Sequence, residues 1–118
     1  MSIKNVYTHV KNAQVKAIEK ITHNISAKHA HHAANSVFKD LKLENNFIHG
    51  LGHGIGLEVH EAPHVRAKGK DKLKQRMVFS IEPGLYFPWG GVRIEDLVTI
   101  DNEKAKILGK TQEELIEI

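Results

Sequence analysis

Cysteine is absent from this sequence, and membrane-spanning apolar runs are absent as well. Without cysteine, disulfide bonds and thiolate metal ligands are excluded. No apolar run reaches the length that crosses a bilayer, and the polar start of the chain does not have the pattern of a signal peptide. We therefore expect a cytoplasmic protein that has no membrane partner.

Dense basic blocks with interleaved aromatic residues are also missing, although the formal net charge is +3. The most basic stretch, RAKGKDKLKQR (66–76), alternates its charged residues with others. This pattern indicates a solvated loop, so we expect no nucleic-acid partner.

The sequence does contain the material for one small globular domain, residues 1–118, because 41% of the residues are hydrophobic. From Ile3 to about Lys20, apolar residues recur at steps of three and four, which predicts a helix. Ser26 is a candidate N-cap for a second helix that reaches Leu41. The short break between the two favours an antiparallel helix pair.

After about Asn45 the pattern changes to strands and turns. MVFSIEPG (77–84) predicts a short strand ending at Pro-Gly, and LYFPWGGVRIEDLVTI (85–100) predicts a hairpin turning at Gly90–Gly91. Phe87 and Trp89 fit packing at the hairpin tip better than a substrate wall. TQEELIEI (111–118) is either a last helical turn or an edge strand. The predicted fold class is α+β, a helix pair followed by an antiparallel sheet.

The stretch HGLGHGIGLEVHEAPH (49–64) has glycine at every second position from Gly50 to Gly56. In an extended chain these glycines share one face, so something must pack closely against bare backbone. Their spacing fits neither the dinucleotide fingerprint nor a phosphate loop. HEAPH (60–64) matches the zincin motif H-E-x-x-H, but that motif requires a helix, and Pro63 opposes one. We interpret the match as coincidental.

Two carboxylates, Glu82 and Glu95, stand at or within apolar strands. Burying such groups is costly unless a cation compensates them. Arg93 shares a strand face with Glu95 and could form a structural ion pair. With His53 on the glycine-rich strand, a metal site is the better interpretation, because one imidazole and two carboxylates suit Mn, Co, Zn or Fe.

Three motifs in this order, HGLGHGIGLEVHEAP, MVFSIEPGLY and GGVRIEDLVTI, resemble the C-terminal half of the Xaa-Pro peptidases. These belong to the pita-bread metallopeptidases, which include prolidase, aminopeptidase P, methionine aminopeptidase and creatinase. The first helix, VYTHVKNAQVKAIEKI, also resembles the corresponding helix of that group. The resemblance implies one half of a pita-bread fold, a proline-containing peptide substrate and two divalent metal ions.

The resemblance also implies roles for individual residues. His53 and Glu82 resemble ligands of one metal ion, and Glu95 resembles the carboxylate that bridges two. Glu82 would also act on the attacking water, and His60 would stabilise the tetrahedral intermediate, so both are candidate catalytic residues.

The resemblance also implies roles for three residues around these ligands. His49 and His60 correspond to residues on the substrate side, and Arg93 to a residue that orients the carboxylates. Because His60 has the opposite strand parity to His53, both can face one site only if a turn or bulge separates them.

The chain departs from the family pattern in its ligand set. The family uses five protein ligands, and two are aspartates from an upstream D.G....Y..D.TR segment that has no match here. We therefore expect a truncated relative whose site holds at most one metal ion weakly, and which is weakly active or inactive alone.

Three functions remain open on this basis. The chain is an Xaa-Pro peptidase completed by an upstream segment or a complementary aspartate-bearing chain, an inactive fragment or paralogue, or a module that binds a peptide or partner. Half of the fold alone would leave an open sheet edge and an uncovered apolar face, which favours a homodimer or a heterodimer. The cluster His29, His31 and His32 receives no role from the resemblance and predicts exposed imidazoles at a helix start.

Overall fold

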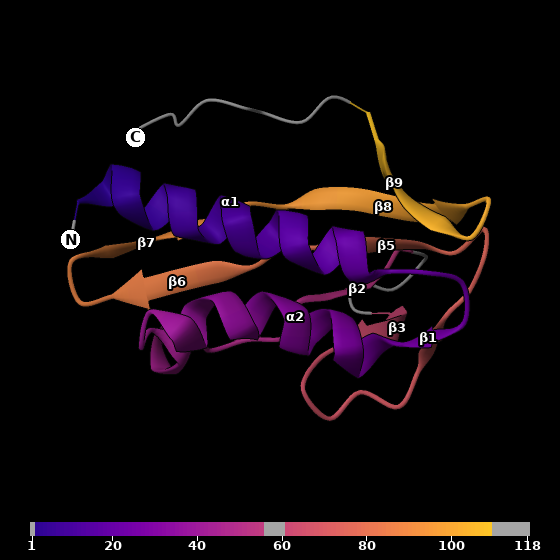
Figure 1. Cartoon of the computed structure of the whole chain (residues 1–118), viewed down its shortest axis with the longest axis horizontal. Coiled ribbons are helices and arrows are strands. Elements are labelled where there is room, and N and C mark those ends of the chain that lie inside the picture. The colour runs from indigo at the N-terminus through magenta and orange to yellow at the C-terminus, as the bar shows by residue number, and fades with distance from the viewer. Residues whose placement is uncertain (1, 56–60, 110–118) are drawn as a thin grey trace.

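The computed structural model describes residues 2–55 and 61–109, shown in Figure 1 as two helices beside antiparallel strands. The helices are α1 (Ile3–Lys20) and α2 (Ala27–Asp40), followed by the 3-10 turn η1 (Glu44–Asn46). The strands are β1 (Ile25–Ser26), β2 (Gly52–Gly54), β3 (Glu61–Val65), β4 (Lys72–Leu73), β5 (Val78–Ile81), β6 (Gly84–Phe87), β7 (Gly90–Arg93), β8 (Asp96–Asp101) and β9 (Lys104–Leu108). This is the predicted α+β arrangement.

The two helices form the antiparallel pair that the sequence predicts (Figure 1). Val6, Val10 and Ala17 of α1 are fully buried, as are Ala34 and Phe38 of α2. These residues recur at steps of four and seven, so each helix buries one stripe against its neighbours. Neither described helix combines the length and apolar character needed to cross a lipid bilayer.

The two helices begin in different ways. The Ser2 hydroxyl caps α1 by accepting a hydrogen bond from the Asn5 N–H at 3.2 Å. Ser26 occupies the N-cap position of α2 as predicted, but its side chain makes no capping hydrogen bond. Instead, the Ala27 N–H donates to the Asp71 carbonyl oxygen at 2.8 Å. A backbone carbonyl of the basic stretch 66–76 therefore satisfies one of the N–H donors at the start of α2.

Five strands form the main sheet in the order β3-β2-β5-β8-β9, with every pairing antiparallel. Strand β8 alternates as expected when one face of a sheet is covered: Val98 and Ile100 are buried, whereas Leu97 and Asp101 are exposed. The covered side belongs to a core that both helices share. Strands β1 with β4, and β6 with β7, form two smaller ladders.

The β6–β7 hairpin turns two residues earlier than predicted. Phe87 pairs with Gly90, so Pro88 and Trp89 form the turn and Gly90 begins the return strand. Proline is favoured at the second position of such a turn and glycine at the fourth, which explains the shift. Trp89 is 55% exposed and stacks on Phe87, so packing at the hairpin tip is confirmed.

The structure also corrects the position of Glu95. It lies in the short break between β7 and β8, not inside the return strand of the hairpin. Its neighbours keep the predicted alternation, because Val92 and Ile94 are buried while Arg93 is exposed. The segment 111–118 lies outside the described residues.

Candidate metal centre

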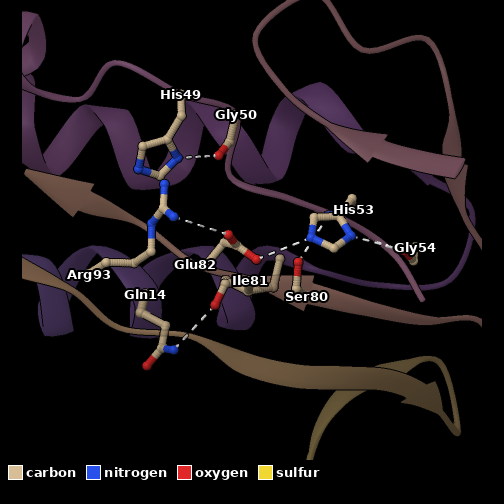
Figure 2. A network of polar contacts seen from close by, with 9 residues as sticks. All are labelled: Gln14, His49, Gly50, His53, Gly54, Ser80, Ile81, Glu82 and Arg93. Atoms are coloured by element: carbon tan, nitrogen blue, oxygen red, sulfur yellow. Dashed lines mark hydrogen bonds and ion pairs between the residues drawn. The ribbon is translucent and has the colours of Figure 1, made fainter. Parts of the chain in front are cut away.

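Three side chains from separate segments converge beside the end of β5. His53 lies in β2, Glu82 directly follows β5, and Glu95 lies between β7 and β8. One candidate ligand atom from each lies within 4.8 Å of those from the other two. Figure 2 shows His53 Nε2 facing Glu82 Oε2 at 3.4 Å. The fold thus brings together the three residues that the sequence predicts as ligands.

Glycine at position 52 allows β2 to lie directly against β5. A Cβ atom at Gly52 would overlap the Ser80 carbonyl oxygen, so a side chain is incompatible with this close approach. The Ser80 hydroxyl accepts a hydrogen bond from the His53 N–H at 3.1 Å. The prediction that bare glycine backbone packs against another segment is therefore confirmed at this position.

A backbone carbonyl sets the orientation and the tautomer of the His53 ring. Nδ1 lies 3.0 Å from the Gly54 carbonyl oxygen, which can only accept a hydrogen bond. Nδ1 therefore carries a proton, and Nε2 is the ring nitrogen that faces Glu82. An imidazole nitrogen facing a carboxylate oxygen is an arrangement that a cation between them stabilises.

Glu82 has one oxygen that the described side chains leave without a donor. Its side chain is only 13% exposed, and Oε2 is buried with no hydrogen-bond partner. Oε1 lies 3.9 Å from Nη1 of Arg93, whose guanidinium also lies over the Tyr86 ring at 5.6 Å. Arg93 thus forms a long ion pair with Glu82, as the sequence allowed. The ion pair leaves Oε2 of Glu82 without a hydrogen-bond partner.

Glu95 completes the group, although much of this residue is exposed. Burial, a hydrogen bond with Glu82 and the negative charge of Glu82 raise the pKa of the Glu95 carboxyl, while His53 and Arg93 oppose the rise. Two carboxylates in this proximity favour binding either a proton or a cation. The orphaned oxygen, the imidazole nitrogen and the crowded carboxylates therefore fit a divalent metal ion.

A cavity of about 340 Å³ lies beside these side chains. Its polar lining consists of His49, His53, His64, Arg66, Glu82 and Arg93. His49 Nδ1 donates to the Gly50 carbonyl oxygen at 2.6 Å, and its Nε2 is buried without a hydrogen-bond partner. Burial is the main cause that lowers the pKa of His49. The neutral ring therefore presents a hydrogen-bond acceptor at the wall of the cavity.

Comparison with known proteins shows which family has this arrangement. The sequence profile of metallopeptidase family M24 matches residues 2–102. The chain belongs to metallopeptidase family M24. An Xaa-Pro dipeptidase of Pyrococcus furiosus is 43% identical over 114 residues, which cover 96% of this chain and 33% of that protein.

Solved structures agree with the M24 assignment. The prolidase from Pyrococcus horikoshii superposes with a TM-score of 0.90 at 44% identity, covering 96% of this chain and 33% of that one. The Xaa-Pro dipeptidase from Bacillus anthracis gives a TM-score of 0.90 at 34% identity, over 97% and 32% of the two chains. The chain has the pita-bread fold of these proteins and spans about a third of their length.

Within this M24 chain, the histidine cluster of α2 differs from the prediction. His29 and His32 are exposed as expected, but His31 is only 8% exposed and stacks on Phe47, with ring centroids 5.0 Å apart. Burial, reinforced by neighbouring imidazoles, lowers the pKa of His31 to about 4. His31 lies on the buried stripe of α2, a position that the helical period alone could have indicated.

The described part of the HEAPH segment forms a strand beside the site. Residues 61–65 form β3, so the helical zinc-binding reading of H-E-x-x-H does not apply to them. His60 lies outside the described residues, and its role stays a prediction. His64 and Arg66 were not predicted to line the cavity. The pairing of His53 with His64 places them there, and that register is not visible in the sequence.

Proposed function

We propose that this M24 chain supplies three metal ligands and part of the substrate pocket of an Xaa-Pro dipeptidase. The observation that carries the proposal is the convergence of His53, Glu82 and Glu95, of which His53 and Glu82 also line a cavity. Similar proteins are named prolidase or Xaa-Pro dipeptidase, which indicates the substrate class. Residues 1–118 would then form the C-terminal half of a metallopeptidase catalytic domain.

The metal positions follow from the ligand set. His53 and Glu82 would hold one ion of Mn, Co, Zn or Fe, and Glu95 would bridge it to a second. The aspartate segment that completes both positions in the family has no match in these 118 residues. The chain alone would therefore hold at most one ion, weakly. When bound, such ions activate water and polarise the scissile carbonyl.

The chain's own side chains would handle the proton and orient the reacting groups. Glu82 would also accept a proton from the attacking water. His60, by its resemblance to the family's substrate histidine, would donate a hydrogen bond to the oxyanion of the tetrahedral intermediate. Arg93, 3.9 Å from the other oxygen of Glu82, would keep that carboxylate oriented.

The basic wall of the cavity favours a substrate with a free carboxylate nearby. Arg66 and Arg93 provide guanidinium groups at this wall. Guanidinium groups bind carboxylates through charge-assisted hydrogen bonds. In a dipeptide the C-terminal carboxylate lies one residue from the scissile bond. A dipeptide ending in proline therefore fits this cavity better than a long peptide does.

The remaining ligands would come from an upstream segment of a longer chain or from a complementary aspartate-bearing chain. Metal titration tests the part assigned to this chain. Calorimetry with Mn²⁺ should show weak uptake and no complete tight equivalent. Glu95→Gln should remove most of the uptake, because Glu95 would contact both metal positions. Glu103→Gln, which neutralises an exposed carboxylate between β8 and β9, is the matched control. Two tight equivalents, or uptake unaffected by Glu95→Gln, would contradict the assignment.

Hydrolysis of Xaa-Pro dipeptides separates a peptidase from a module that only binds peptides. The isolated chain should show no measurable turnover, because the activation supplied by a complete metal pair is missing. Addition of a polypeptide that carries the aspartate segment should restore turnover. Dipeptide binding without turnover in that mixture would favour the inactive module, and robust turnover by the isolated chain that is lost on His60→Ala would contradict the incomplete site.

A further inference from the structure

Gln14 is a fully buried amide in the middle of α1. Its neighbours on the same stripe, Val10, Ala13 and Ala17, are apolar and equally buried. An amide in such surroundings is costly unless its hydrogen bonds are made. The partners of Gln14 therefore indicate why a polar residue occupies this position.

The Gln14 side chain joins three segments of the fold. Nε2 donates to Asp96 Oδ2 at 2.8 Å and to the Ile81 carbonyl oxygen at 3.4 Å. Figure 2 shows the amide nitrogen directed at Ile81, on the side of the strand end that carries Glu82. Oε1 accepts a hydrogen bond from Lys11 Nζ at 3.1 Å. Both polar atoms of the buried amide are thus engaged.

The partners on the sheet adjoin two of the proposed metal ligands. Ile81 directly precedes Glu82, and Asp96 directly follows Glu95. Ile81 and Asp96 are also Cα partners at the end of the β5–β8 ladder. Gln14 therefore holds the last pair of that ladder, from which both glutamates extend.

The two glutamates need such a support because like charges repel each other. Candidate ligand atoms of Glu82 and Glu95 lie within 4.8 Å of one another. Repulsion between the carboxylates favours any shift that moves the ends of β5 and β8 apart. Such a shift would break the buried hydrogen bond from Gln14 to Asp96, which is strong because the surroundings are apolar.

We propose that Gln14 is a positioning residue that fixes the separation of the Glu82 and Glu95 carboxylates and so sets the metal affinity of the site. This inference rests on the proposed function, in which both glutamates are metal ligands. Gln14 does not line the described cavity, so it acts only through Ile81 and Asp96.

Gln14→Met tests the proposal, because it removes the hydrogen bonds while nearly preserving side-chain volume. We expect Mn²⁺ to bind this variant about tenfold more weakly, as when other residues that orient metal ligands are replaced. Calorimetry on the 118-residue chain measures the affinity, and urea unfolding of the metal-free chain measures stability. Val10→Ala, on the same buried stripe, is the matched control: it lowers stability through a cavity and should leave the Mn²⁺ affinity unchanged.

A paired exchange keeps the test decisive if Gln14→Met does not fold. Gln14→Glu alone sets two carboxylates against each other, whereas Gln14→Glu with Asp96→Asn restores a donor and an acceptor in exchanged positions. The double variant should recover part of the lost affinity, because the bond between positions 14 and 96 is restored while the one to the Ile81 carbonyl oxygen is not. Absence of rescue, or equal weakening by Gln14→Met and Val10→Ala, overturns the positioning role. Mn²⁺ binding that survives both Glu82→Gln and Glu95→Gln overturns the proposed function itself, so the two failures are distinguishable.

Discussion

At the scale of single residues, burial decides the chemistry of the histidines in α2. His29 and His32 are exposed, whereas His31 is buried against Phe47 and its Nδ1 has no hydrogen-bond partner. Desolvation disfavours the charged imidazole and lowers the pKa of His31 to about 4.

We predict that His31 makes the stability of the chain depend on pH. Its pKa is about 4 in the folded chain against an ordinary value of 6.5, so the unfolded chain binds the proton first as the pH falls. The stabilisation is complete above pH 6.5 and is lost as the pH falls towards 4, by at most about 3 kcal/mol. His31→Phe should flatten the unfolding free energy across this range, measured by urea titration.

The control for this prediction is His29→Phe, which removes an exposed imidazole from the same helix and should leave the pH dependence unchanged. The titratable neighbours of His31, namely His32 and His49, are present in both variants. If the His31→Phe variant kept the same slope as the parent chain, another group would be responsible and the prediction would be wrong.

At the scale of elements, the site depends on how strands approach one another. Strand β2 lies against β5 because Gly52 has no side chain to meet the Ser80 carbonyl oxygen. The same approach lets the Ser80 hydroxyl accept from the His53 N–H. Glu82 N–H in turn donates to the Leu51 carbonyl oxygen at 2.6 Å, so backbone hydrogen bonds join the segments that carry the proposed ligands.

We predict that Gly52→Ala destabilises the chain by more than about 3 kcal/mol, because the added methyl group overlaps backbone that cannot move aside. Gly50→Ala is the control. Its Cβ would lie 3.2 Å from Arg66 Cβ and 3.3 Å from the Val65 carbonyl oxygen. Small shifts relieve those contacts, so we expect a cost of about 1 kcal/mol. Equal unfolding free energies for the two variants, measured by urea titration, would contradict this account of β2.

At the scale of the whole molecule, β3 and β9 are the edge strands of the main sheet among the described residues, and β9 has one isolated bridge, from Lys104 to Thr22. Leu97 and Leu108 pair across β8 and β9 and remain 37% and 40% exposed, and Ile55 is 46% exposed. Exposed strand edges and apolar side chains both promote association. The chain spans about a third of the length of similar M24 proteins.

We predict that the chain alone forms a homodimer or a higher oligomer at micromolar concentration, and that an aspartate-bearing chain would compete for the same face. Leu97→Lys should shift light scattering towards the monomer, because it places a charge on that face. Val15→Lys is the control, at a residue of α1 that is 42% exposed. This variant should not shift light scattering towards the monomer. A parent chain that is monomeric and binds no hydrophobic dye would mean that this half closes its own core.

Local patterns in the sequence were sufficient to predict the helices and to propose the metal ligands. The three- and four-residue recurrence gives the helical stripes, since it depends only on the geometry of one helix. The motifs around His53, Glu82 and Glu95 predict a metal site, because each motif is contained in a few consecutive residues. The α+β class followed from the same local periods and is confirmed.

Only the tertiary structure decided which distant residues meet. The register of β2 against β3 brings His64 to His53, and the approach of α1 to the β5–β8 ladder joins Gln14 to Asp96. The local preference of Pro88 for a turn displaced the turn expected at Gly90–Gly91. Register and contacts between elements depend on the packing of the whole core. A shift of the strand register by one residue would turn every side chain of that strand to the other face of the sheet. For that reason the sequence alone indicated the proposed ligands, and the fold decided which other residues contact them.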